Sequence, residues 1–222
     1  MPYFTKDFIK FFKELSSNNN RDWFNTNKER YEKVVKEPFY NLVAEFLTRI
    51  SFDDQTFFAD PKDAIFRIYR DVRFSKDKSP YKLHASAAIS SVARAAINDP
   101  GFYFEISHKG VNIYCGSYMV DKQGLTKIRN YIMHNSKVLD KILKDRKFKK
   151  YFGGEILGDK QKRLPKELME AAEKQPLIYN TQFYLHGKLP VSTITSNKLG
   201  DELYNHYAAA KEVINFFRRA LK

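Results

Sequence analysis

The chain has 222 residues, of which 43% are hydrophobic and 29% charged, a composition that is ordinary for a folded protein and argues against disorder. Lys and Arg total 39 against 26 Asp and Glu, which leaves a net charge of +13 at pH 7. A positive field of this kind attracts nucleic acid, phosphorylated metabolites or an anionic membrane surface, but it does not select among them.

Several protein classes are excluded by simple features. The single cysteine, Cys115, cannot form an internal disulfide. The N-terminal residues carry charges throughout, so no secretion signal is predicted, and no stretch approaches the roughly 18 apolar residues of a membrane span. No lipidation motif stands at either end. We therefore expect a cytoplasmic protein without a membrane partner, and the oligomeric state is not predicted.

The first 50 residues have the spacing of helices. A first helix has one apolar face, a second is expected over residues 23–34 after a cap-like turn at 18–20, and a third starts after Pro38. The apolar face of the first helix consists of Phe8, Phe12 and Leu15. Each of these helices would bury one stripe and leave the other side in solvent.

From about residue 64 to 119 the apolar positions alternate with period two, which predicts strands. One strand is expected over 65–74 and a second, rich in small apolar residues, over 83–92. After a turn at 99–101, two further strands joined by a turn at 108–110 predict an antiparallel hairpin. The apolar residues of the hairpin are Phe102, Phe104, Ile106, Val111, Ile113 and Cys115.

Helical spacing returns over residues 125–132 and 138–143, before Gly153-Gly154 interrupts it. A short helix is then expected over 166–174, a strand over 181–188 and a long final helix over 199–221. The stripe of the final helix consists of Leu199, Leu203, Tyr207, Ala210, Ile214, Phe217 and Leu221.

No Pro-, Ser- or Gly-rich linker and no repeat divides the chain. Helices, then a mostly antiparallel sheet, then helices again predict an α+β fold in a single domain over residues 1–222. Residues 153–165 give the least support to that single domain.

Residues 65–84, IFRIYRDVRFSKDKSPYKLH, are unusually basic and are called the basic segment below. Six cations stand there against two acids, namely Arg67, Arg70, Arg73, Lys76, Lys78 and Lys82 against Asp71 and Asp77. In a strand over 65–74, side chains alternate between two faces. One face would present a row of donors made of Arg67, Tyr69, Asp71 and Arg73.

Arg70 would then lie on the opposite, apolar face, where a charge needs a partner because burying it alone is costly. That face consists of Phe66, Ile68, Val72 and Phe74. We expect a carboxylate beside Arg70, and Glu105 on a neighbouring strand is one candidate. Pro80 disfavours helical conformation at Ser79, so residues 75–82 are expected to form a loop between strands.

The basic segment is the candidate functional site. Guanidinium groups bind phosphate or carboxylate through paired hydrogen bonds, and charge-assisted bonds are about twice as strong as neutral ones. We therefore predict binding of a phosphorylated or other anionic small molecule through Arg67, Arg70, Arg73, Lys78 and Lys82. Candidates for proton transfer are His84, Tyr69 and Tyr81. In the alternative interpretation, these arginines are structural and tie helices to the sheet through ion pairs.

The segment FRIYRDVRFSKDKSPYK, from Phe66 to Lys82, with His84 close behind, resembles the bacterial conserved-hypothetical proteins catalogued as domain of unknown function 2461. The resemblance extends to NNNRDWF at residues 18–24, to further positions in the helical region, and more weakly to the final helix. Those further positions are Asn27, Arg30, Tyr31, Pro38 and Phe39. The resemblance implies a single domain and no particular activity, cofactor or catalytic residue.

Other motifs are weak. Ser75 and Lys78 match the Ser-x-x-Lys signature of penicillin-recognising enzymes, but Pro80 disfavours the helix that this signature needs. Gly-rich phosphate-binding motifs are absent, so no cofactor is predicted. The histidines have no zinc-ligand spacing, so no metal is predicted. They are His84, His108, His134, His186 and His206. Cys115 fits a small core residue better than a nucleophile.

Two alternative functions remain open. A second basic run surrounds a predicted helix and consists of Lys137, Lys141, Lys144, Arg146, Lys147, Lys149 and Lys150. Its simplest interpretation is a solvated face, but the same layout could follow a nucleic-acid backbone. The protein could also be a scaffold that meets an acidic partner. The sequence does not decide whether any ligand is turned over.

Overall fold

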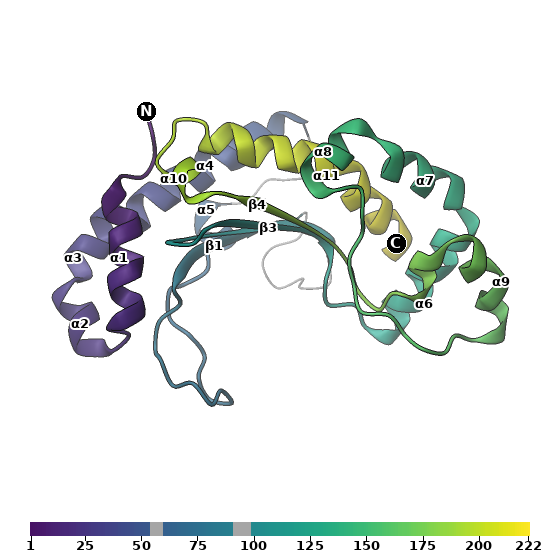
Figure 1. Cartoon of the computed structure of the whole chain (residues 1–222), viewed down its shortest axis with the longest axis horizontal. Helices are drawn as coiled ribbons and strands as arrows, with labels where there is room; N and C mark the ends of the chain where they lie inside the picture. The colour runs from purple at the N-terminus through teal and green to yellow at the C-terminus, as the bar shows by residue number, and fades with distance from the viewer. Residues whose placement is uncertain (54–59, 91–98) are drawn as a thin grey trace. The chain divides into compact units, whose positions relative to one another are not determined.

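The computed structural model describes residues 1–53, 60–90 and 99–222 (Figure 1). Within these residues four strands form one antiparallel sheet in the order β1-β2-β3-β4, with helices at both ends of the chain. The predicted α+β class is therefore confirmed. The strands are β1 His84–Ile89, β2 Gly101–Ser107, β3 Gly110–Ser117 and β4 Phe183–Leu189.

The helices follow the predicted order along the chain. Before the sheet lie α1 Lys6–Ser17, α2 Arg21–Thr26, α3 Lys28–Tyr31, the π-helical turn η1 Glu32–Lys36, α4 Glu37–Asp53 and α5 Pro61–Ala64. After β3 lie α6 Lys122–His134, α7 Ser136–Lys144, α8 Arg146–Phe152, α9 Lys166–Lys174 and the 3-10 turn η2 Pro176–Tyr179. After β4 lie α10 Val191–Ile194 and α11 Leu199–Leu221.

The helix predicted over residues 23–34 is not continuous. The Asn20 side chain caps α2 by accepting a hydrogen bond from the Trp23 amide at 2.9 Å, and α2 ends at Thr26 with Asn27 as its C-cap. The wide turn η1 then leads into α4, in which Pro38 is the second residue. Proline has no amide hydrogen and its ring crowds the carbonyl four residues earlier, so a widened turn ahead of Pro38 accommodates it.

The packing of the chain divides it into two compact units. Unit 1 consists of residues 1–89, 103–112 and 188–204, and unit 2 of residues 90–102, 113–187 and 205–222. Strands β2, β3 and β4 and helix α11 each contribute residues to both units. The single domain predicted for residues 1–222 stays a prediction.

In unit 1 the core lies between α4 and one face of the sheet. The ring of Phe104 on β2 contacts the rings of Phe39 and Phe46 on α4, at centroid distances of 5.7 and 5.9 Å. Burial alternates along β2 with period two. Tyr103 and Glu105 therefore point to the opposite face of the strand, which we call the open face.

In unit 2 the core is equally aromatic. Phe183 of β4 packs on Phe217 of α11 at 5.1 Å, and Phe216 of α11 packs on Tyr131 of α6 at 4.9 Å. Burial alternates along β4 as it does along β2, with Phe183 and Leu185 buried. Tyr184 and His186 therefore lie on the open face of β4.

Most predicted elements outside the basic segment are confirmed. The hairpin of β2 and β3, the short helix α9 and the strand β4 lie where periodicity placed them. Gly153 ends α8 in the left-handed conformation, with φ 73°, which favours glycine at a helix C-terminus. The strand predicted over 83–92 is β1, and residues 91–92 lie outside the described residues. Across the described ranges no helix combines the length and the apolar composition needed to cross a membrane.

Arg129 of α6 is a buried cation of unit 2 that donates to neutral oxygens. Its Nε donates to the Ile178 carbonyl at 2.9 Å, and its Nη2 donates to Gln161 Oε1 at 2.8 Å and to the Asn180 carbonyl at 3.3 Å. The Arg129 side chain thus joins η2, through Ile178 and the adjoining Asn180, to the segment that contains Gln161.

Replacing Arg129 with methionine should lower the free energy of unfolding by about 3 kcal/mol, because the two buried carbonyls of Ile178 and Asn180 lose their donor. The measurement is urea unfolding followed by circular dichroism. The matched control is Arg146→Met, at an exposed position of α8, which should change the free energy by less than about 0.5 kcal/mol. Equal effects of the two substitutions would contradict the structural role of Arg129.

Candidate functional site

The basic segment follows α5, runs outward and returns to β1 as two extended arms (Figure 1). The arms pair through hydrogen bonds from the amide of Phe66 to the Ser86 carbonyl at 2.9 Å and from the amide of Lys82 to the Ile68 carbonyl at 2.8 Å. Isolated bridges join Ile65 to Ala87 and Tyr69 to Tyr81. The strand predicted over 65–74 is therefore an irregular arm. Pro80 in the returning arm has no amide to donate, which interrupts a regular ladder.

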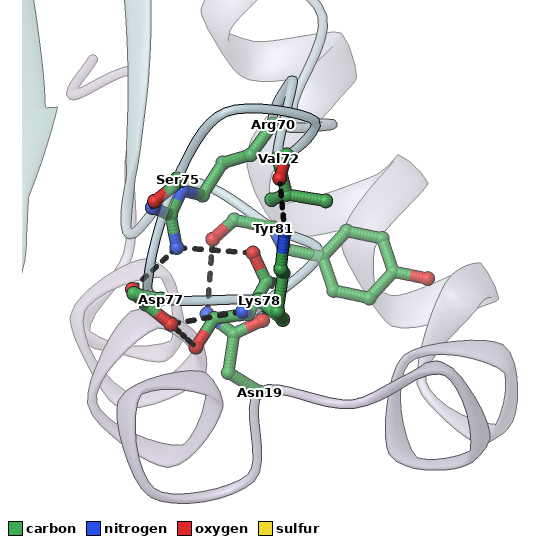
Figure 2. Close-up of polar contacts among 8 residues, drawn as sticks. Asn19, Arg70, Val72, Ser75, Asp77, Lys78 and Tyr81 are labelled. Atoms are coloured by element: carbon green, nitrogen blue, oxygen red, sulfur yellow. Dashed lines mark hydrogen bonds and ion pairs between the residues drawn. The ribbon is translucent and has the colours of Figure 1, made fainter.

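Residues 71–79 form the tip of the segment, and Arg70 closes it (Figure 2). Arg70 Nη1 donates to Asp77 Oδ2 at 2.5 Å and to the Ser79 carbonyl at 3.0 Å, and Nη2 donates to Ser75 Oγ at 3.4 Å. A carboxylate partner for Arg70 was predicted correctly, but the choice of Glu105 was wrong. The chain turns back at the tip and brings Asp77 within reach.

The carboxylate of Asp77 is held by more than Arg70. It accepts hydrogen bonds from the Ser79 hydroxyl at 2.6 Å and from the Ser79 amide at 2.9 Å. These bonds, followed by the one from Arg70, lower the pKa of Asp77 to about 2. The carboxylate consequently stays ionised throughout the neutral range.

Two more predicted ligand-binding residues are engaged inside the tip. Arg73 pairs with Asp71 at 2.7 Å, and this hydrogen bonding lowers the pKa of Asp71 to about 2. The ammonium group of Lys78 reaches the carbonyl of Val72 at 3.0 Å, as Figure 2 shows. Phe74 was predicted on the apolar face, but it lies at the tip and is 97% exposed. The error arose because the alternation of an extended strand was applied as far as residue 74, although the chain already turns within residues 71–79.

The returning arm is pinned to the N-terminal helices of unit 1. Asn19 Nδ2 donates to the Tyr81 carbonyl at 2.9 Å, and Asn19 Oδ1 accepts from the Tyr81 amide at 3.1 Å. The Tyr81 ring stacks on Phe24 of α2 at 4.0 Å and is 3% exposed. Tyr81, a candidate for proton transfer, is thus an aromatic anchor, while Tyr69 is 51% exposed.

The remaining two predicted ligand-binding residues, Lys82 and Arg67, lie on opposite faces of the arms. The Lys82 ammonium lies over the Phe66 ring at 5.0 Å, and Phe66 in turn contacts Tyr103 of β2 at 6.0 Å, on the open face. Neighbours in an extended chain point to opposite sides, so Arg67 lies on the other face, with Tyr69. The five predicted ligand-binding residues do not converge on one place, and Lys82 is the one beside His84.

His84 instead belongs to a polar network on the open face of β1, β2 and β3. Its Nε2 lies 3.5 Å from Glu105 Oε2. The same oxygen accepts a hydrogen bond from the Tyr103 hydroxyl at 3.0 Å. Glu105 Oε1 accepts a hydrogen bond from Asn112 Nδ2 at 3.1 Å. Both His84 and Glu105 are about three-quarters buried, with side-chain exposures of 28% and 22%. The carboxylate is therefore fixed in position beside the imidazole.

The environment of His84 favours the neutral imidazole, because the pKa of the ring is lowered from its usual value. Burial lowers its pKa below the usual 6.5, the nearby Lys82 lowers it further, and Glu105 opposes both by raising it. A carboxylate beside an imidazole favours proton uptake by the ring, because a nearby negative charge stabilises the imidazolium.

The pairing of β3 with β4 places one more polar side chain in line with these residues. Tyr114 of β3 stacks on His186 of β4 at 4.8 Å, which sets the pairing of these antiparallel strands in unit 2. Two residues further along, in unit 1, the same register places Lys188 beside Asn112. We call His84, Glu105, Asn112 and Lys188 the polar row. At about 4.8 Å per strand, the row spans about 14 Å.

Sequence reasoning identified part of this row and its surroundings. His84 was named for proton transfer and the neighbouring Lys82 for binding, whereas Asn112 and Lys188 of the row and the adjacent Tyr103 were missed. A signal for Asn112 was present, because the short turn at 108–110 fixes the hairpin register and sets Glu105 opposite Asn112. The pairing of β3 with β4 joins segments about 70 residues apart, and the sequence carries no comparable signal for it.

Two other features of the chain lie in unit 2. The basic run from Lys137 to Lys150 occupies α7 and α8, and its cations are exposed. A hollow of about 290 Å³ includes Asp121, Lys127 and Leu221 in its lining and none of the predicted site residues. In the described part of the chain, no three His, Cys, Asp or Glu side chains gather closely enough to hold a metal ion. Cys115 is buried, and burial raises the pKa of its thiol.

A family model described as conserved hypothetical protein (DUF2461) matches residues 7–216. The match confirms the family suggested by the basic segment and its surroundings. No curated protein matches the chain.

The Asn19 contacts predict how the basic segment is held. Asn19→Ala removes both hydrogen bonds to Tyr81 and should weaken local protection by about 1–2 kcal/mol. Hydrogen exchange measured by mass spectrometry should then become faster in the peptide containing Tyr81 and Lys82. The control Asn18→Ala removes a bond to the Glu14 carbonyl of α1 and should leave that peptide unchanged. Unaltered exchange in Asn19→Ala would show that Phe24 alone anchors the arm.

The charges around His84 predict opposite effects of two substitutions on its pKa. Glu105→Gln should lower the pKa further, and Lys82→Gln should raise it, because each removes one of the charges that act on the imidazole. NMR titration of the imidazole resonances measures both. The exposed Lys76→Gln is the control. Since the unfolded chain protonates His84 more readily, the contribution of His84 to stability should fall as the pH drops below about 6.5. A His84 pKa above 6.5 would contradict this environment.

Proposed function

Because the chain belongs to the DUF2461 family of conserved hypothetical proteins, we propose its function from the geometry of its residues: the polar row binds a phosphorylated or other anionic small molecule, and His84 exchanges a proton with it. The observation that supports this proposal is the imidazole of His84, 3.5 Å from a carboxylate that Tyr103 and Asn112 hold in place, with Lys82 nearby.

The charges at the two ends of the row favour an anion. Lys82 stands beside His84, and Lys188 is exposed at the β4 end. Between them Glu105 is the acidic residue of the row, and its oxygens already accept from Tyr103 and Asn112. A ligand that reaches both lysines must extend over roughly 14 Å. This suits a phosphorylated metabolite better than a single inorganic ion.

Protonation of His84 would couple to binding. An anion placed between Lys82 and the imidazole favours the imidazolium form, so the bound state takes up a proton that the unbound state lacks at pH 7. Affinity should therefore increase as the pH falls from about 8 to about 6. Toward a ligand with an acidic proton, the same imidazole serves as a general base that Glu105 orients.

Arg70, Arg73 and Lys78 have a different part in this proposal. Their groups engage Asp77, Asp71 and the Val72 carbonyl, so they shape the tip of the basic segment. Surface ion pairs of this kind contribute little to global stability because solvent screens them. Their value for function is that they hold the arm that carries Lys82.

The test is a thermal-shift screen of phosphorylated metabolites, with inorganic phosphate and pyrophosphate as reference probes. We expect at least one metabolite to raise the Tm by several degrees, since a ligand at one hundred times its Kd adds about 2.7 kcal/mol of stability. Lys82→Gln and Lys188→Gln should each abolish most of this shift. His84→Gln should remove its growth at lower pH.

Arg73→Gln is the matched control, because it removes a cation of the same segment that pairs within the tip. It should retain the ligand-induced shift. Loss of the shift in Arg73→Gln with retention in Lys82→Gln would reject the polar row and return the site to the tip.

A further inference from the structure

The open face of unit 2 carries a group of aromatic rings that the proposed small-ligand site does not use. Tyr114 and His186 stack with centroids 4.8 Å apart and planes 14° apart. Tyr118 meets Tyr184 edge to face at 5.4 Å. We call these four rings the aromatic face. Ile113 and Cys115 flank Tyr114 on β3, and their side chains are buried on the opposite face of the strand.

These rings are accessible to solvent. Tyr118 is 56% exposed, His186 is exposed, and Tyr114 and Tyr184 are half-buried. Aromatic side chains on the face of a sheet, outside its core, leave flat apolar surface in water. Such a face can be covered by another flat ring, and the chemistry beside it indicates which kind.

A basic strand-like segment runs along the edge of β4. Leu157 and Tyr184 exchange two backbone hydrogen bonds, at 2.7 and 3.0 Å. The backbone amide of Gln161 donates a hydrogen bond to the Tyr179 carbonyl at 2.8 Å. Gly158 makes this approach possible, because a Cβ there would overlap the Gln182 carbonyl oxygen. Residues 157–163 are called the basic edge below.

The cations of the basic edge are Lys160, Lys162 and Arg163. All three are exposed, and none has an ion pair within the residues that the structure describes. Lys160 pairs with Asn180 in an isolated bridge, and it follows Leu157 by three residues, or about 10 Å of extended chain. Lys160 therefore lies about 10 Å along the basic edge from the residue that pairs with Tyr184, and Lys162 and Arg163 follow it further along the same segment.

We propose that the aromatic face and the basic edge bind single-stranded nucleic acid, with unpaired bases stacked on the rings and backbone phosphates beside Lys160, Lys162 and Arg163. Rings that take up bases and cations that follow the phosphates are the two components of sequence-tolerant single-strand binding. This site goes beyond the small-ligand function and shares no residue with the polar row.

Two physical arguments favour a single strand over other occupants. In a duplex the base faces are covered by neighbouring pairs, so flat rings on a sheet gain nothing from it. A neutral planar molecule would use the rings but not the three cations. An anionic strand uses both, and the net charge of +13 draws it to the protein.

The experiment measures fluorescence anisotropy of a short labelled oligothymidylate and of a duplex of equal length, over a series of salt concentrations. We expect tighter binding of the single strand. Tyr118→Leu and Tyr184→Leu should each weaken binding roughly tenfold, since one base loses its stacking partner. Tyr184→Phe keeps a ring and should bind as the unmodified protein does. Thermal unfolding confirms that each variant is folded.

Charge variants separate the basic edge from other basic surfaces. Lys160→Gln and Lys162→Gln should each reduce the slope of log affinity against log salt by about 0.7 for a lost phosphate contact. The combined Lys137→Gln, Lys141→Gln and Lys144→Gln variant of α7 should leave that slope unchanged. Preference for the duplex, full affinity in both leucine variants, a flattened slope in the α7 variant, or no binding at low salt would each overturn the proposal.

Discussion

Side chains of β2, β3 and β4 alternate between a face packed into the core and an open face, and both proposed sites depend on this alternation. Sliding one strand by a single residue would bury Glu105 or Tyr184 and expose Phe104 or Phe183. The first residue of β3 resists such a slip against β4, because only glycine fits there. Gly110 has φ 125°, and a Cβ there would lie 2.6 Å from the Leu189 carbonyl oxygen. Register therefore decides which chemistry reaches solvent.

Periodicity predicted the elements well because burial of one face imposes it directly. The hairpin, α9, β4 and α11 all follow from spacing alone. The basic segment was harder to predict, because Arg70 contacts Asp77 only after the chain has reversed direction. The spacing of apolar residues carries no information about that reversal. Glu105 was named as a candidate partner of Arg70 for the same reason, and the partner is Asp77. The true neighbours of Glu105, namely His84 and Asn112, follow from the pairing of three strands.

The cations of the tip and the charged residues of the open face have different roles. The tip of the basic segment uses Arg70, Arg73 and Lys78 on its own carboxylates and carbonyls, at distances between 2.5 and 3.0 Å. A dense cluster of cations in a sequence therefore need not form an anion site. On the open face, by contrast, fewer charges lie beside groups that can stack, donate or accept a proton. Chemical variety in a small area is the better guide to function.

The exposure of Phe74 has a practical use. Its side chain is 97% exposed at the tip, and the only cysteine of the chain, Cys115, is buried with a raised thiol pKa. A maleimide dye would therefore react selectively with a Phe74→Cys variant, since exposed thiols ionise and react far more readily than buried ones. A fluorophore there would report on the orientation of the arm in solution without altering the rest of the molecule.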